Sequence, residues 1–77
     1  MMTQARMVPV GSNPKMFVRT DRVIGMEIVT RYAGTGKKYI LTIHMDGMPT
    51  AGVVFDSEYE AAQAACALMN EINEATS

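Results

Sequence analysis

The sequence has few of the residues on which disulfides, metal sites and side-chain catalysis depend. Its 77 residues include one cysteine, Cys66, one histidine, His44, and no tryptophan. One cysteine cannot form an intrachain disulfide, and one cysteine with one histidine cannot supply the four ligands of a structural zinc site. We therefore expect a domain with no disulfide, no metal and no cofactor.

Long apolar runs are also absent. No stretch approaches the roughly 20 apolar residues that a membrane-spanning helix needs. Residues 1–10 contain one arginine and lack the apolar segment of a signal peptide. We expect a cytoplasmic protein that does not contact a membrane.

The short chain limits the size of the core. A domain of this length buries only roughly 60% of the surface that its unfolded chain exposes. One layer of helix on sheet leaves no room for an enclosed substrate cavity. Since disulfides and metals are excluded, association with a partner or a second copy is the remaining source of extra stability. Eight methionines are present, either as core residues or as an adaptable contact surface.

The hydrophobic pattern predicts four strands, at 15–20, 23–32, 38–45 and 48–55. Residues 1–14 form a flexible or edge-strand leader, in which Pro9 would hold a short strand at an edge. In the third strand Tyr39, Leu41, Ile43 and Met45 share one face. Gly25 suggests a bulge in the second strand. Asp46-Gly47 is the preferred pair for a two-residue type I′ hairpin.

A helix is predicted over residues 58–74. Ser57-Glu58-Tyr59-Glu60 has the form of a capping box, in which Ser57 caps the Glu60 amide and Glu60 returns a bond to the Ser57 amide. An apolar stripe at helical spacing follows and is expected to face the sheet. It comprises Ala62, Ala65, Cys66, Met69 and Ile72, broadened by Ala61 and Leu68. The predicted fold is α+β: an antiparallel sheet of three to four strands with one C-terminal helix packed on one face.

A two-residue hairpin would place Ile40 opposite Val53 and Lys38 opposite Phe55, on the sheet face that the single helix cannot cover. Contiguous exposed apolar residues mark interaction sites. Two alternatives are that the N-terminal segment folds over this face and that a bulge shifts the register. The predicted protein interface comprises Ile40, Thr42, Val53 and Phe55, with Arg31 and Lys38 at its rim.

Catalytic motifs are not matched. Gly34-Thr35-Gly36-Lys37-Lys38 departs from the phosphate-binding loop, because Arg31 stands where that loop has its first glycine and Lys38 where it has Ser or Thr. We interpret His44 as a surface residue without a catalytic role and Cys66 as a buried, inert thiol. The sequence therefore predicts that the protein is not an enzyme.

Charge is divided unevenly along the chain. Up to Phe55 there are seven basic residues and three acids, a balance of +4, whereas Asp56 and the residues after it add five acids and no Lys or Arg. A basic sheet side and an acidic helix side are expected. The basic side attracts phosphates or an acidic protein patch. The residues predicted to contact nucleic acid are Arg19, Arg22, Arg31, Lys37 and Lys38.

Residues Tyr39 to Met69 run as a strand, an Asp-Gly turn, a strand ending in Phe55-Asp56-Ser57, and a helix opened by Glu60-Ala61-Ala62. This order resembles the DNA-binding arms of tyrosine integrases and the AP2-type plant domains, and it implies a sheet that enters the major groove. Those families carry many Arg and Lys on the groove-facing strands, whereas the strand here offers Lys38, Thr42 and His44. The architecture also resembles small inhibitors and accessory proteins of phages and plasmids.

Two functions follow, in this order. The first is a small non-enzymatic protein-interaction module, an inhibitor or adaptor that binds a larger protein or nucleoprotein partner, with a homodimer as one form of it. The second is a sheet-based module that binds DNA or RNA. Near-neutral net charge and few aromatic residues for base stacking place it second.

Overall fold

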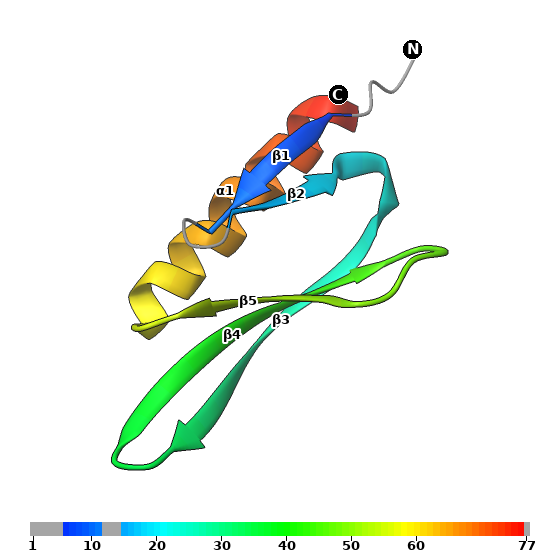
Figure 1. Ribbon diagram of the computed structural model, residues 1–77. Coiled ribbons are helices and arrows are strands. Elements are labelled where there is room, and N and C mark those ends of the chain that lie inside the picture. Colours follow the sequence, from blue (N-terminus) through cyan, green and yellow to red (C-terminus); the bar gives the residue numbers. More distant parts are fainter. Residues whose placement is uncertain (1–5, 12–14, 77) are drawn as a thin grey trace.

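Two antiparallel sheets and one helix make up the protein, as shown by a computed structural model that describes residues 6–11 and 15–76 (Figure 1). This confirms the predicted α+β class. The elements are β1 (Met7–Val10), β2 (Met16–Arg19), a 3₁₀ turn (Thr20–Arg22), β3 (Val23–Ala33), β4 (Gly36–Met45), β5 (Ala51–Phe55) and α1 (Glu58–Thr76). The remainder of the predicted leader, residues 1–5 and 12–14, lies outside the described part.

The first two strands form a hairpin of their own. Val8 pairs with Val18, and both side chains are buried, as is that of Val10. Met7 of β1 and Phe17 of β2, whose side chains point to the other face of this hairpin, are exposed. Pro9 lies in β1, which pairs with β2 alone among the described strands, so its missing N–H removes no ladder bond to a further strand.

The larger sheet has the strand order β3–β4–β5. The turn between β3 and β4 contains Gly34 and Thr35, and Gly34 has a φ of 59°, the sign that a type II′ turn requires at its first central position. The ladder register shifts between Val23 and Gly25, which confirms the predicted bulge. Because β5 pairs only with Tyr39–Ile43, the far end of the β3–β4 hairpin projects as a two-stranded arm (Figure 1).

The predicted hairpin at Asp46-Gly47 is wrong in both loop length and register. Gly47 has a φ of 71°, but no non-glycine residue in the described part has positive φ, so Asp46 lacks the conformation of a type I′ turn. The Asp46 amide donates instead to the Arg22 carbonyl at 2.7 Å, and β5 begins only at Ala51. Leu41 therefore opposes Val53, and Ile40 opposes Val54. This one-residue shift turns every side chain of β5 to the other face of the sheet.

The helix begins as its sequence predicts but is rotated about its axis. The Glu60 amide donates to Ser57 Oγ at 3.1 Å, while the return bond, in which the Ser57 amide would donate to the Glu60 carboxylate, is not formed. The buried line follows Ala61, Leu68 and Ala75. Ala61 and Leu68, which broadened the predicted stripe, are therefore correctly placed, and Ala65 and Ile72 pack partly against the core. Ala62, Cys66 and Met69, also predicted to face the sheet, are exposed. The line that meets the sheet lies roughly a quarter turn from the predicted stripe, because Leu68 rather than Met69 fills the space above the strands.

The core lies where the helix, the β1–β2 hairpin and one face of the larger sheet meet. Its fully buried members include Val18, Leu41, Ile43 and Leu68. The half-buried side chains of Met26, Ile28 and Phe55 pack around them. The second face of the larger sheet takes no part in this cluster.

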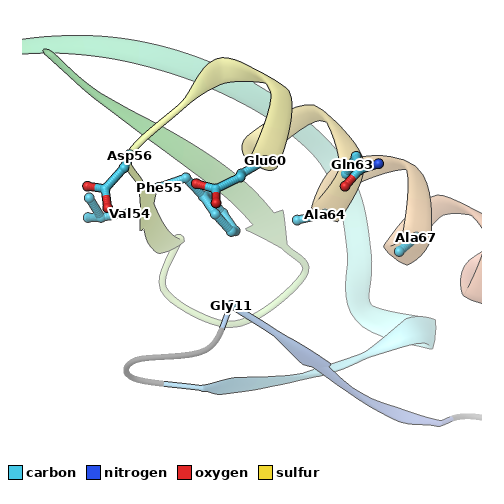
Figure 2. A pocket seen from close by; sticks show the side chains of 8 residues that line it. All are labelled: Gly11, Val54, Phe55, Asp56, Glu60, Gln63, Ala64 and Ala67. Atoms are coloured by element: carbon cyan, nitrogen blue, oxygen red, sulfur yellow. The ribbon is translucent and has the colours of Figure 1, made fainter.

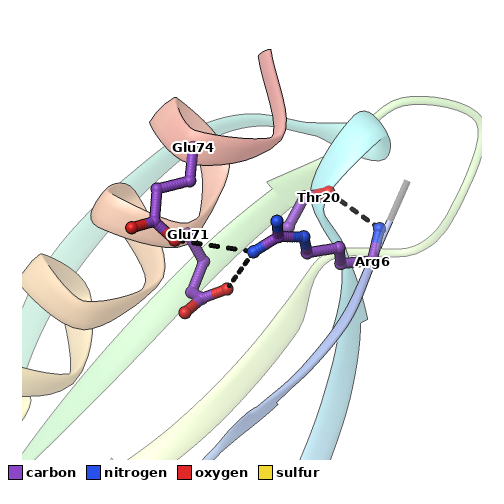
Figure 3. A network of polar contacts seen from close by, with 4 residues as sticks. All are labelled: Arg6, Thr20, Glu71 and Glu74. Atoms are coloured by element: carbon purple, nitrogen blue, oxygen red, sulfur yellow. Dashed lines mark hydrogen bonds and ion pairs between the residues drawn. The ribbon is translucent and has the colours of Figure 1, made fainter. Parts of the chain in front are cut away.

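A polar network ties the N-terminal strand to the end of the helix (Figure 3). The Thr20 amide donates to the Arg6 carbonyl at 2.9 Å, and the Arg6 amide donates to Thr20 Oγ1 at 3.1 Å. The Arg6 guanidinium reaches Glu71 at 3.3 Å and Glu74 at 3.5 Å. Part of the acidic charge of the helix is thus paired within the molecule.

Candidate functional site

Three aliphatic side chains lie in line across the sheet face that the helix leaves uncovered. Val29 of β3 is directly opposite Ile40 of β4, which is directly opposite Val54 of β5. Val29 is 38% exposed and Val54 58%, while Ile40 is half-buried between them. We call Val29, Ile40 and Val54 the apolar row. The β1–β2 hairpin does not cover it, because Val8, Val10 and Val18 belong to the core on the opposite face.

One flank of the apolar row carries a histidine–carboxylate pair. His44 Nε2 lies 3.1 Å from Glu27 Oε1, and His44 Nδ1 lies 3.5 Å from the Thr50 hydroxyl. Thr42, half-buried, stands opposite Glu27 on the neighbouring strand. No local spacing in the sequence indicated this pair, because β3 and β4 bring together residues that are 17 positions apart.

The other flank is mostly basic. Arg31 stands directly opposite Lys38, and both are exposed. Lys38 Nζ bonds to Asp56, and this hydrogen bond, together with the charge of the ammonium, lowers the pKa of the Asp56 carboxyl from its ordinary value of 3.8. Arg31 has no ion partner among the residues that the structure describes. Like charges directly opposite each other in a ladder are unfavourable, so Arg31 is the less satisfied of the two cations.

The structure places only part of the predicted interface on this face. Ile40, Thr42, Arg31 and Lys38 are there. Val53 is 6% exposed in the core, and the half-buried Phe55 packs on the core side, so both were assigned to the wrong face. Val54, which the sequence did not indicate, takes the position expected of Val53, opposite Ile40. Pro49 gave no signal against the expected register, because in a two-residue hairpin it would stand opposite His44 in a non-hydrogen-bonded pair, where its missing N–H costs nothing.

The predicted nucleic-acid residues divide into two groups. Arg31, Lys37 and Lys38 gather on the projecting arm, where the Lys37 ammonium lies 5.6 Å from the centre of the Tyr32 ring. Tyr32 is 73% exposed. Arg19 pairs with Asp21 at 2.8 Å, and the Arg22 guanidinium lies near Gly47, so both belong to the opposite end of the β3–β4 hairpin. The arm therefore carries three cations rather than five.

A depression of about 690 Å³ lies beside the helix, between β5 and the end of β1 (Figure 2). Asp56 and Glu60 make its polar part acidic, and Val54 and Phe55 of β5 contribute to its wall. The remaining lining comes from Gly11 and from Gln63, Ala64 and Ala67 of the helix. It continues the site from Val54 toward the helix, and no sequence motif indicated it.

The outer side of the helix holds a second, shallower depression of about 660 Å³. It is lined by Tyr59, Ala62, Gln63, Cys66, Ala67 and Asn70. The Cys66 thiol is exposed here, so the prediction that it is buried is wrong. Among the described residues no group of three or more His, Cys, Asp or Glu side chains is placed to hold a metal ion.

Comparisons with known proteins place the chain in no family: no family model, no curated protein and no solved structure matches it. Within residues 6–11 and 15–76, no helix combines the length and the apolarity that crossing a membrane requires. The surface described above is therefore the basis for assigning a function.

Proposed function

We propose that this domain is a non-catalytic protein-interaction module, an inhibitor or adaptor that holds a larger protein on the open face of β3–β5. The observation that carries the proposal is the apolar row, which crosses all three strands and remains exposed at both ends. Removing apolar surface from water is worth roughly 25 cal/mol per Å². A partner that covers Val29, Ile40 and Val54 would gain this free energy.

The flanks of the apolar row supply specificity. Glu27 with His44 lies on one side, and Arg31 with Lys38 and Asp56 on the other. A partner surface must match the charges of both flanks to bind in register. Charges arranged in this way select partners and orient encounter more than they add affinity.

The group formed by Thr50, His44 and Glu27 has the order of a nucleophile, base and acid, yet we interpret it as part of the binding rim. The distance of 3.5 Å from the hydroxyl to His44 exceeds the usual range for a nucleophile and its base. Glu27 is 59% exposed, and the group lines neither of the two depressions. Hydrolases of this type also aim hydrogen-bond donors at the reacting oxygen from a site that excludes water.

The test is capture of partners by immobilised full-length protein, compared across two matched variants. Val54→Asp places a charge in the apolar row, whereas Ile24→Asp places the same charge at a 72% exposed apolar position outside it. We expect mass spectrometry to identify a protein retained by the wild type and by Ile24→Asp and released from Val54→Asp. If Val54→Asp retains every captured protein, the proposal is wrong.

A second function, binding of nucleic acid by the arm, is favoured by its three cations: Arg31 and Lys38 lie on one face of the arm, and Lys37 lies beside the exposed Tyr32 on the other. Each phosphate that a cation neutralises releases counterions, so log K would fall with log salt at a slope of roughly −0.9 per contact on duplex DNA. We expect Lys37→Ala to reduce that slope by about one. Failure to bind duplex or single-stranded DNA, or RNA, at low salt would contradict this function.

A further inference from the structure

We infer that the outer edge of β3 pairs with β3 of a second copy about a twofold axis at Val29, joining two three-stranded sheets into one of six strands. β3 has 11 residues, and β4 is its only ladder partner among the described strands. A long edge strand of this kind offers a row of backbone groups for pairing with another chain. Figure 1 shows β3 running along the side of the sheet away from β5.

The backbone alternation permits this pairing. A two-residue loop is closed by a hydrogen-bonded pair, here Ala33 with Gly36. Counting back along the antiparallel ladder, the peptide groups of even-numbered residues, among them Ile28 and Thr30, point away from β4. In a twofold pair centred on Val29, Ile28 of one copy lies opposite Thr30 of the other, so outward-facing groups meet outward-facing groups.

Charge favours the axis at Val29 over an axis at either neighbouring residue, Ile28 or Thr30. With the axis at Val29, each Glu27 lies opposite the Arg31 of the second copy, on the same face as the apolar row. A twofold interface must be self-complementary, and this pattern of acid, valine and base satisfies that condition. An axis at Ile28 would place Arg31 opposite Gly25, and an axis at Thr30 would place it opposite Val29. Arg31, which faces Lys38 and has no ion partner in the described part of its own chain, thereby gains a carboxylate.

Packing on both faces agrees with the same axis. On the open face the two Val29 side chains meet, and the two apolar rows become one continuous row across six strands. On the core face, the exposed ring of Tyr32 comes to lie beside Met26 of the second copy, a contact between sulfur and an aromatic ring. The pairing thus places apolar contacts on both faces of the joined sheet.

This inference goes beyond the proposed function and can fail separately from it: Glu27, Val29 and Arg31 of β3 test the dimer, whereas Val54, which the pairing leaves exposed, tests the proposed function. Sedimentation velocity of the full-length protein over a wide concentration range is the first measurement, and we expect a dimer. Arg31→Glu should shift the protein to the monomer, because each new glutamate would face Glu27. Combining it with Glu27→Arg should restore the dimer. Lys37→Glu, which makes the same change in charge on β4, should leave the dimer intact.

Cross-linking fixes the position of the axis. Val29 faces its own counterpart in a non-hydrogen-bonded pair, where Cα atoms stand about 4.5 Å apart, a distance within the range of disulfides. In a Cys66→Ser background, Val29→Cys should form a disulfide-linked dimer on mild oxidation. Tyr32→Cys should not, because six residues along the strand, about 20 Å, would separate the two thiols. A wild type that stays monomeric at every concentration overturns the inference. So does a dimer that persists in Arg31→Glu, or one in which Tyr32→Cys links as readily as Val29→Cys.

Discussion

The side chain of Ile40 lies over Gly52 of the neighbouring strand, and a Cβ atom added to Gly52 would stand 3.3 Å from Ile40 Cγ2. This separation is tighter than ordinary van der Waals contact, so the isoleucine must move if the glycine is replaced. Ile40 is half-buried on an open face and has room to rotate toward solvent. The absence of a side chain at Gly52 therefore sets how deeply the centre of the apolar row sits.

Gly52→Ala should displace Ile40 with little effect on stability. Alanine favours an extended strand over glycine by roughly 0.5–1 kcal/mol, which offsets the crowding. We expect the free energy of unfolding in urea to change by less than about 1 kcal/mol, while the Ile40 methyl signals shift in NMR spectra. A loss of several kcal/mol would mean that Ile40 cannot rotate.

Substitutions at Val53 and Val54 test the register of β5. Val53→Asp buries an unpaired charge next to Leu41 and should cost more than about 3 kcal/mol. Val54→Asp places the same charge in solvent and should cost less than about 1 kcal/mol. Chemical denaturation of the two variants is the measurement. If Val54→Asp destabilised the domain more than Val53→Asp, β5 would have the register of the two-residue hairpin predicted from the sequence.

Lys38 should control the titration of Asp56. The hydrogen bond and charge of Lys38 lower the pKa of the Asp56 carboxyl in the folded state below 3.8. The same carboxyl therefore binds a proton more readily in the unfolded state. The stabilisation by this pair is therefore present above the unfolded pKa and is lost as pH falls through the folded value. NMR titration of the Asp56 carboxyl should give a pKa that rises when Lys38 is replaced by Met. An unchanged pKa in that variant would remove Lys38 as the cause.

Leu68 and Met69 should differ sharply in their effect on stability, although they are neighbours in the helix. Leu68 is 1% exposed, so Leu68→Ala leaves a cavity in the core and should cost about 2–5 kcal/mol. Met69 is 51% exposed, and Met69→Ala should change stability by less than about 0.5 kcal/mol. Thermal and urea unfolding of the two variants would show whether the helix has the described rotation.

Cys66 should react with a thiol reagent in the folded protein. Its side chain lies on the outer face of the helix, so modification does not require unfolding. We expect labelling with a maleimide to go to completion without denaturant and to leave the circular dichroism spectrum unchanged. Protection that denaturant removes would place the thiol in a packed interface.

Local chemistry in the sequence determined much of the fold. The alternation in Lys38–Met45, the Gly25 bulge, and the serine cap before an alanine-rich segment each act through neighbouring residues, and the structure confirms all three. Lys38 and Ile40 were also correctly placed on one face, because the period of a strand assigns the faces of its own residues without knowledge of its partner.

Only the tertiary structure decided which residues of β5 and of the helix face the core. The Asp46 amide extends the contact with β3 by donating to the Arg22 carbonyl, β5 begins only at Ala51, and its register, shifted by one residue, exchanges Val53 for Val54. An alanine-rich helix has small side chains on several sides, so its sequence leaves its rotation open until one large residue, Leu68, fills the space above the sheet. The pairing of His44 with Glu27 depends in the same way on a cross-strand contact. Such contacts join residues far apart in the chain, and their geometry is set by packing rather than by local preference.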